Sequence, residues 1–251
     1  MASKYVETDA IVCLEKNLGE LQLKEDKKRE AEDWLENRES MEILITGRIG
    51  TGKSTLVNAL VDVRMAGTGR DLRVRARYVT GYEAKTKEGM KVLMWSADLE
   101  DNSEDAERCL QEMKENCSNV DIIIYCLDVS AARAQLGGAD KEQMKDLCAI
   151  KKLTEKFGRD LWGHSIFVLT RANALEAMLN VGSDLEKKFK ERLEDWERRI
   201  HAALEEEGVP TDIAKGVPVK PAGYVKKPHL PGHKDWLSSL WSAFTQRAES
   251  I

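Results

Sequence analysis

The amino-acid sequence predicts an α/β protein with a mostly parallel, doubly wound sheet. Apolar segments of strand length alternate along the chain with amphipathic segments of helix length, and the first strand runs into a glycine-rich turn and a helix. This order is typical of sheets with helices on both faces, which bind ligands at the carboxyl ends of the strands. With 251 residues, 42% hydrophobic and 33% charged, the chain has enough apolar side chains for one such domain.

The elements follow from local patterns in chain order. Strands are expected at 41–46, 90–95, 120–127, 165–169 and 217–220. Helices are expected at 55–61, 100–118, 141–157, 183–207 and from about 234 onward. The helix 183–207 is the clearest, because it has a Ser183-x-x-Glu186 capping box and an apolar stripe at helical spacing. Residues 66–89, rich in Gly and Arg without a clear period, predict an exposed loop with a weak strand.

The chain divides at about residue 40. Residues 1–40 are dense in Glu, Lys and Arg, and Leu14, Leu18 and Leu21 share one helical face. We therefore expect an N-terminal helical extension at 1–40, which packs on the flank of the domain or serves in self-association. Residues 41–251 form the main domain, including its C-terminal helix.

Composition excludes several classes of protein. The net charge of −5 gives no general attraction to nucleic acid, so no nucleic-acid partner is expected. The longest apolar run, 122–127, is far shorter than the roughly 20 residues of a membrane helix, and the N-terminus lacks a signal core. The five cysteines lack the spacing of a disulfide frame or zinc site. These features predict a cytoplasmic protein whose membrane contact, if any, is peripheral.

A phosphate-binding loop lies between the first strand and its helix. Residues 47–54 (GRIGTGKS) match G-x-x-x-x-G-K-[ST] at every fixed position. Successive backbone N–H groups of such a loop point at phosphate oxygens, and the helix adds its positive N-terminal end. Lys53 reaches the β- and γ-phosphates, and the Ser54 hydroxyl ligates Mg²⁺. The predicted nucleotide-binding residues are Arg48, Ile49, Gly50, Thr51, Gly52, Lys53, Ser54 and Thr55.

Two later segments occupy the places where G domains read guanine. Their [NT]-K-x-D motif follows a later strand, and Thr170-Arg171-Ala172-Asn173 follows the strand at 165–169. The segment 217–224 lies where a second guanine-reading loop would follow the next strand.

With these segments the chain resembles the immunity-associated (GIMAP, avrRpt2-induced-gene type) G domains, related to septins and to chloroplast import-receptor GTPases. The resemblance extends from Glu42 to Arg247 and is strongest to the invertebrate-type relatives. It rests on the segments ITGRIGTGKSTLVNAL, SNVDIIIYCLD, FGRDLWGHSIFVLTRAN and PVKPAGY…LPGHKDWL in this order.

The resemblance implies a three-layer G domain that binds GTP or GDP with Mg²⁺. Its nucleotide state would control assembly as a homodimer or larger homo-oligomer, often at membranes. By matching, Gly50 to Thr55 hold the phosphates and Mg²⁺. The base is held by Thr170, Arg171 and Asn173, while Ala222 and Gly223 offer backbone N–H groups to the guanine carbonyl.

The metal-binding segment departs from the family pattern. G domains carry Asp-x-x-Gly just after the second apolar strand, where the Asp holds Mg²⁺ through water and the Gly N–H binds the γ-phosphate. If that strand ends at Trp95, Ser96 and Leu99 occupy these positions. Asp98 takes over the metal contact only if the loop shifts by two residues, a shift that preserves the strand face. Thr80 is the candidate for the threonine that closes over the metal.

These departures predict altered chemistry. Phosphoryl transfer depends on positioning and charge neutralisation, so we expect GTP to be hydrolysed slowly or not at all. Asn173 replaces the base-reading Asp, so it accepts only one guanine donor and opposes the other with its own N–H. An unsatisfied donor of this kind costs about 1–3 kcal/mol, which predicts looser base selectivity.

Other interpretations stay open at this point. Arg48 is either a solvated side chain or one that reaches the nucleotide or a partner subunit as an arginine finger. The strand 122–127 ends in Asp128, which resembles the metal-site carboxylate of a phosphate-loop ATPase or kinase. A third alternative is a pseudo-enzyme scaffold in which nucleotide only stabilises the fold.

Overall fold

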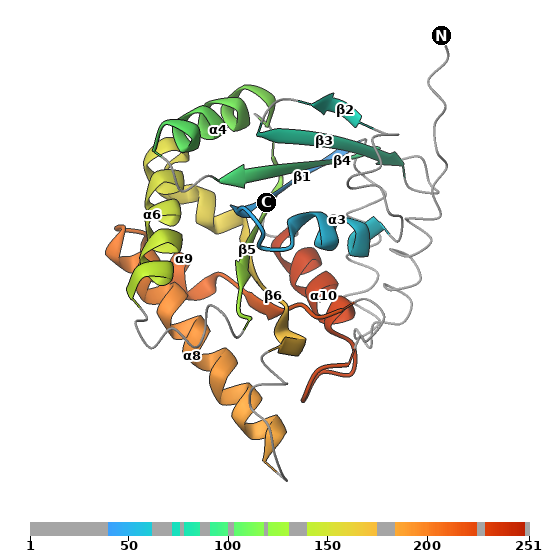
Figure 1. Cartoon of the computed structure of the whole chain (residues 1–251), viewed down its shortest axis with the longest axis vertical. Helices are drawn as coiled ribbons and strands as arrows, with labels where there is room; N and C mark the ends of the chain where they lie inside the picture. The colour runs from blue at the N-terminus through green and yellow to red at the C-terminus, as the bar shows by residue number, and fades with distance from the viewer. Residues whose placement is uncertain are drawn as a thin grey trace.

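A seven-stranded sheet with the order β2-β3-β4-β1-β5-β6-β7 forms the centre of the molecule (Figure 1). The computed structural model describes residues 40–61, 72–75, 78–85, 91–99, 103–117, 120–130, 140–174, 184–224 and 229–248. The N-terminal extension expected at 1–40 therefore lies almost entirely outside the described residues.

The strands are β1 (Ser40–Arg48), β2 (Leu72–Arg75), β3 (Val79–Lys85), β4 (Lys91–Leu99), β5 (Ile122–Asp128), β6 (Ser165–Thr170) and β7 (Val219–Pro221). β1 pairs in parallel with β4 and β5, and the parallel pairing continues through β6 to β7. β3 pairs antiparallel with both β2 and β4. Every residue of β5 is buried, as expected for a central parallel strand covered on both faces.

The helices are α3 (Lys53–Val61), α4 (Ser103–Asn116), α6 (Asp140–Phe157), α8 (Leu185–Glu206), α9 (Thr211–Gly216) and α10 (Trp236–Ala248), with a 3₁₀ helix η1 (Arg159–His164). α3 and α10 cover one face of the sheet, and α4 and α6 cover the other, with α8 beside α6 (Figure 1). The expected doubly wound α/β fold with three layers is confirmed. Among the described helices, none is long and apolar enough to span a membrane.

The helix expected at 183–207 is present as α8. The apolar stripe packs on the core as expected, with Phe189, Ile200 and Leu204 buried. Ser183 of the expected capping box lies outside the described residues, and the N-cap within them is Asp184, whose side chain makes no capping hydrogen bond.

Two sequence expectations for the sheet are wrong. The stretch 66–89, expected to be a loop with one weak strand, supplies both β2 and β3. β4 continues to Leu99 instead of ending at Trp95, because it pairs with β1 on one side and β3 on the other. Backbone hydrogen bonding from two neighbours therefore extends the strand past the point where its apolar pattern ends.

Candidate functional site

The phosphate loop connects β1 to α3 at the carboxyl edge of the parallel strands. Its first residue, Gly47, has φ +138°, and a Cβ there would lie 2.5 Å from the carbonyl oxygen of Cys126 in β5. The loop thus needs glycine because the neighbouring strand backbone leaves no room. Burial raises the pKa of the Cys126 thiol to about 12, and the positive charge of Lys53 only partly opposes this shift.

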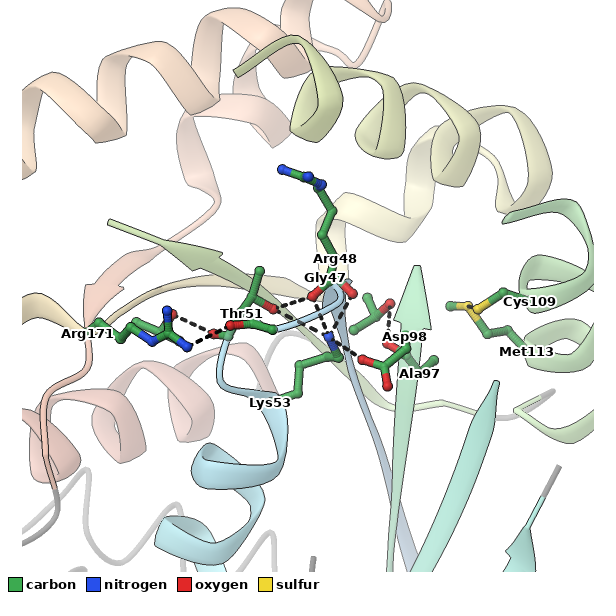
Figure 2. A network of polar contacts seen from close by, with 12 residues as sticks. Gly47, Arg48, Thr51, Lys53, Ala97, Asp98, Cys109, Met113 and Arg171 are labelled. Atoms are coloured by element: carbon green, nitrogen blue, oxygen red, sulfur yellow. Dashed lines mark hydrogen bonds and ion pairs between the residues drawn. The ribbon is translucent and has the colours of Figure 1, made fainter. Parts of the chain in front are cut away.

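Lys53 lies inside the loop, with 3% of its side chain exposed. Its Nζ donates to the carbonyl oxygens of Gly47 at 2.9 Å and Arg48 at 2.6 Å (Figure 2). The Thr51 hydroxyl donates to the Arg48 carbonyl at 2.8 Å, closing the loop around the ammonium group. Lys53 is therefore held where the phosphate-loop motif requires a cation.

Asp98 supplies the counter-charge of this lysine. Asp98 Oδ1 lies 2.6 Å from Lys53 Nζ, and 53% of the Asp98 side chain is exposed (Figure 2). In the β1–β4 register Asp98 is level with Gly47, whereas Ser96 is level with Ile45 inside the sheet. The strand thus runs on past Trp95 and brings Asp98, instead of Ser96, to the phosphate loop.

Thr80 does not lie at this edge of the sheet. It is part of β3 and pairs with Ser96 of β4, two residues before Asp98. A strand rises about 3.4 Å per residue, so Thr80 lies two residues along the strands from the position level with Asp98. Thr80 is thus held by pairing within the sheet, and its role as the threonine that closes over the metal stays a prediction.

The segment after β6 is bonded to the phosphate loop. The Thr170 hydroxyl donates to the Thr51 carbonyl oxygen at 2.6 Å, with the Leu127 carbonyl 3.0 Å away. Arg171 donates through Nη2 to the Gly50 carbonyl at 2.9 Å and through Nη1 to Asp128 Oδ2 at 2.5 Å. Arg171 has φ +59°, uncommon for a residue other than glycine. These contacts fix both residues against the loop.

Asp128 is fully engaged at the end of β5. Oδ2 accepts from Arg171, and Oδ1 accepts the backbone N–H of Ser130 at 2.8 Å. Only 2% of its side chain is exposed. Both carboxylate oxygens thus have partners within the protein, which disfavours Asp128 as a metal ligand of an ATPase.

A pocket of about 100 Å³ lies beside the phosphate loop. Four segments that are distant in the sequence form it: α3 with its preceding turn, the end of β6, the residues after β7, and the start of α10. Its lining includes six residues that the sequence predicts for nucleotide binding, Gly52, Thr55, Thr170, Arg171, Ala222 and Gly223. Sequence reasoning missed Tyr224 and Trp236, which also line it. Tyr224 is the last residue of the predicted base segment 217–224 and directly follows Gly223, which is the signal that could have found it.

Asn173 lies next to this pocket without being part of its lining. Its Oδ1 accepts the backbone N–H of Tyr224 at 2.5 Å, and its side chain packs against Gly223. Its Nδ2 is buried and has no hydrogen-bond partner among the described residues, and the same holds for Trp236 Nε1.

Arg48 points away from Lys53, toward α6 (Figure 2). Its Nη1 lies 3.8 Å from Asp146 Oδ2, and only 6% of its side chain is exposed. The pKa of the neighbouring Tyr125 hydroxyl is raised, mainly by burial and next by the Asp146 carboxylate, and the positive charge of Arg48 partly opposes this rise. Both expectations for the Arg48 side chain, solvated or an arginine finger, are therefore wrong: it is buried on the side of α6.

The remaining phosphate-loop residues lie on the surface. Ser54 and Thr55, at the start of α3, are exposed, as is Ile49 at the tip of the loop. The structure thus brings together the phosphate loop, Asp98 and the two base segments.

A family comparison matches this architecture. The model of the AIG1 family matches residues 41–203, more than half of the chain. The chain belongs to the AIG1 family. This confirms the resemblance to avrRpt2-induced-gene-type G domains, while the invertebrate-type branch stays a prediction. No curated protein matches the chain.

Several solved GTPases share the fold of this AIG1-family chain. Toc33 from Arabidopsis thaliana in complex with Mg²⁺ and GMPPNP has a TM-score of 0.62 at 19% identity, covering 93% of this chain and 96% of that chain. A structure addressing the dimerisation of atToc33 and psToc159, described as important for their GTPase activity, has a TM-score of 0.63 at 18% identity, covering 90% and 92%. The LeoA bacterial dynamin GTPase from ETEC has a TM-score of 0.57 at 12% identity, covering 97% and 43%. These likenesses establish the G-domain fold.

Proposed function

We propose that this AIG1-family protein is a guanine-nucleotide-binding protein that holds GTP or GDP with Mg²⁺ and assembles according to nucleotide state. The observation that carries the proposal is the convergence of three strand-end segments on one pocket. The pocket is lined by residues of the phosphate loop, by residues 170–171 and by residues 222–223. The first and last of these segments are more than a hundred positions apart in the sequence. The Mg²⁺-bound nucleotide of Toc33 supports the same ligand class.

The roles in the site follow from position. Lys53 would neutralise the phosphates and Ser54 would ligate Mg²⁺, while Asp98, which lies 2.6 Å from Lys53 at the end of β4, would orient the metal. Thr170 and Arg171 position the base segment against the loop. Gly223 would present its backbone N–H to the base, whereas the Ala222 N–H, also predicted for this role, donates to the Leu169 carbonyl at 2.8 Å. When bound, Mg²⁺ neutralises charge between the phosphate oxygens.

Slow GTP hydrolysis remains part of this proposal, but the residue that explains it is a different one from that expected from the sequence. With Asp98 in the metal position, the residue three places later is Asp101 instead of the glycine that contacts the γ-phosphate in G domains. Asp101 lies outside the described residues; a carboxylate at this position of the motif would add negative charge, which opposes the charge neutralisation that phosphoryl transfer needs. We expect Asp101→Gly to accelerate phosphate release from bound GTP. Equal rates in the wild type and the variant would contradict this basis.

Nucleotide identity is the decisive measurement. The protein is incubated with equal GTP and ATP plus Mg²⁺ and desalted, and the retained nucleotide is identified by chromatography. Retained guanine nucleotide that is lost in Lys53→Ala supports the proposal. Retained adenine nucleotide would favour the ATPase interpretation, and stabilisation without turnover or assembly would favour the scaffold.

Self-association through the nucleotide face is supported by exposed apolar side chains. Among the described residues, the exposed large hydrophobic side chains are Ile49, 49% exposed, and Tyr224, 56% exposed. Ile49 lies in the phosphate loop, and Tyr224 lines the adjacent pocket. Sedimentation with GDP and with a non-hydrolysable GTP analogue tests assembly. If Ile49→Ser leaves a nucleotide-dependent dimer intact, the interface lies elsewhere. A cytoplasmic location stays a prediction, which fractionation of cells would test.

A further inference from the structure

Tyr224 is an unusual surface residue. Tyr224 is 56% exposed, whereas most other large apolar residues in the described part of the chain are buried. It lines the pocket beside the phosphate loop together with Thr170, Arg171 and Gly52. An exposed aromatic ring at the wall of a small pocket offers a flat apolar surface to a ligand.

The backbone beneath this ring is held by several contacts. The Tyr224 N–H donates to Asn173 Oδ1 at 2.5 Å. Two residues earlier, the Ala222 N–H donates to the Leu169 carbonyl at 2.8 Å, and the Ala222 carbonyl accepts the Ala172 N–H at 3.0 Å. Between them, Gly223 packs so closely on Asn173 that a Cβ there would collide with Oδ1. The ring therefore projects from a segment fixed to the end of β6.

A second planar group lines the same pocket. The Arg171 guanidinium is held by Asp128 at 2.5 Å and the Gly50 carbonyl at 2.9 Å, while 46% of its side chain stays exposed. Guanidinium planes and aromatic rings both stack on nucleobases, and such stacking tolerates any base because every base has a π-face. The pocket thus combines two stacking groups with the phosphate loop that fixes the other end of a nucleotide.

We propose that Tyr224 binds the face of the purine base by stacking, with Asn173 acting as the positioning residue that holds Tyr224 in place. The inference rests on the proposed nucleotide-binding function and adds a residue that the motifs do not assign. It also gives Asn173 a different role from the Asp of the guanine-reading motif. The Asn173 Oδ1 accepts the backbone N–H of Tyr224 instead of a donor of the base. The affinity for the base therefore depends more on contacts to the face of the base than on hydrogen bonds to its edge.

Two variants of this exposed residue test the proposal. Tyr224→Leu keeps apolar bulk but loses the aromatic face, Tyr224→Phe keeps the face, and thermal unfolding without nucleotide checks the fold. Calorimetry with Mg²⁺ then compares GDP and IDP, which differ only in the 2-amino group at the base edge. Base–aromatic stacking predicts a loss of about tenfold for Tyr224→Leu, equal for GDP and IDP, and recovery in Tyr224→Phe.

The outcomes separate this inference from the function beneath it. If the wild type binds GDP and Tyr224→Leu binds it within twofold of wild type, stacking is refuted and the proposed function stands. A changed ratio of GDP to IDP affinity would mean edge reading, which also overturns stacking. Loss of dimerisation without loss of GDP affinity would assign Tyr224 to a subunit contact instead. If the wild type binds no guanine nucleotide, both proposals fail.

The positioning role of Asn173 is tested with two further variants. Asn173→Asp keeps the acceptor for the Tyr224 N–H, so its ratio of GDP to IDP affinity should equal that of the wild type. Asn173→Leu removes the acceptor and should weaken the binding of GDP and of IDP by the same factor.

Discussion

Replacing Asp98 with Asn tests which residue of β4 serves the metal. The side chain of Asp98 faces Lys53 at 2.6 Å, but it is 53% exposed, so water screens the pair. Such an ion pair contributes about 0–1 kcal/mol to folding. In a domain of this size, 1 kcal/mol corresponds to about 2–4 °C in melting temperature. Because Lys53 keeps two backbone carbonyl acceptors, Asp98→Asn should leave the melting temperature without nucleotide within about 4 °C.

The effect on Mg²⁺ should be much larger. A contact to a charged group contributes about 1.5–3 kcal/mol, equivalent to about 10- to 150-fold in affinity. We therefore expect the ratio of GDP dissociation constants, measured with EDTA and with Mg²⁺, to fall by at least about tenfold in Asp98→Asn. Affinity in EDTA should stay equal or rise, because Lys53 loses its competing carboxylate.

Ser96→Ala is the matched control. Ser96 lies on the same strand face two residues earlier, level with Ile45, and should leave the Mg²⁺ dependence unchanged. Calorimetric titration of the nucleotide-free protein measures both variants. If Ser96→Ala removes the Mg²⁺ dependence and Asp98→Asn does not, the argument from strand register is refuted. A melting temperature far below wild type in Asp98→Asn would show that the carboxylate is mainly structural.

The other predictions concern groups buried around the loop. Arg48→Met should lower the free energy of unfolding, measured by urea titration, by about 3 kcal/mol, because it removes one partner of a buried ion pair. If Arg48 were an arginine finger, the same variant would lower turnover and leave the stability unchanged. Gly47→Ala should destabilise by more than Gly50→Ala, since only the first Cβ meets a backbone oxygen, at 2.5 Å, and denaturant unfolding of both variants ranks them. Iodoacetamide at pH 8 should label exposed Cys148 and spare Cys126, read by peptide mass spectrometry. Because the Cys126 pKa is raised from 9.0 to about 12, the unfolded thiol ionises first, so stability falls as pH rises between these values.

The fold class and the phosphate loop could be predicted because their physical causes are local. The loop needs glycines and a lysine at fixed spacing, and α8 needs an apolar stripe at helical spacing, so both are written in adjacent residues. The segments 170–173 and 222–223 could be placed because parallel strands end at one edge of the sheet.

The errors have a common cause in pairing between distant segments. The end of β4 was placed at Trp95 because Ser96 breaks the apolar pattern, yet two neighbouring strands carry the pairing to Leu99. Only one weak strand is expected where β2 and β3 both form, because this Gly- and Arg-rich sequence becomes a pair of strands through pairing with each other. The burial of Arg48 depends on Asp146, nearly a hundred residues later, and no local pattern indicates that contact.

The contact between Arg48 and Asp146 joins the phosphate loop to α6 on the sheet face opposite α3 (Figure 1). A ligand that holds the loop closed lowers the population of open states in which this contact is broken. Slow amide hydrogen exchange in 140–157 would therefore report occupancy of a site that this helix does not line. The outer surface of α6 is then a place where a binding partner could sense the nucleotide without approaching it.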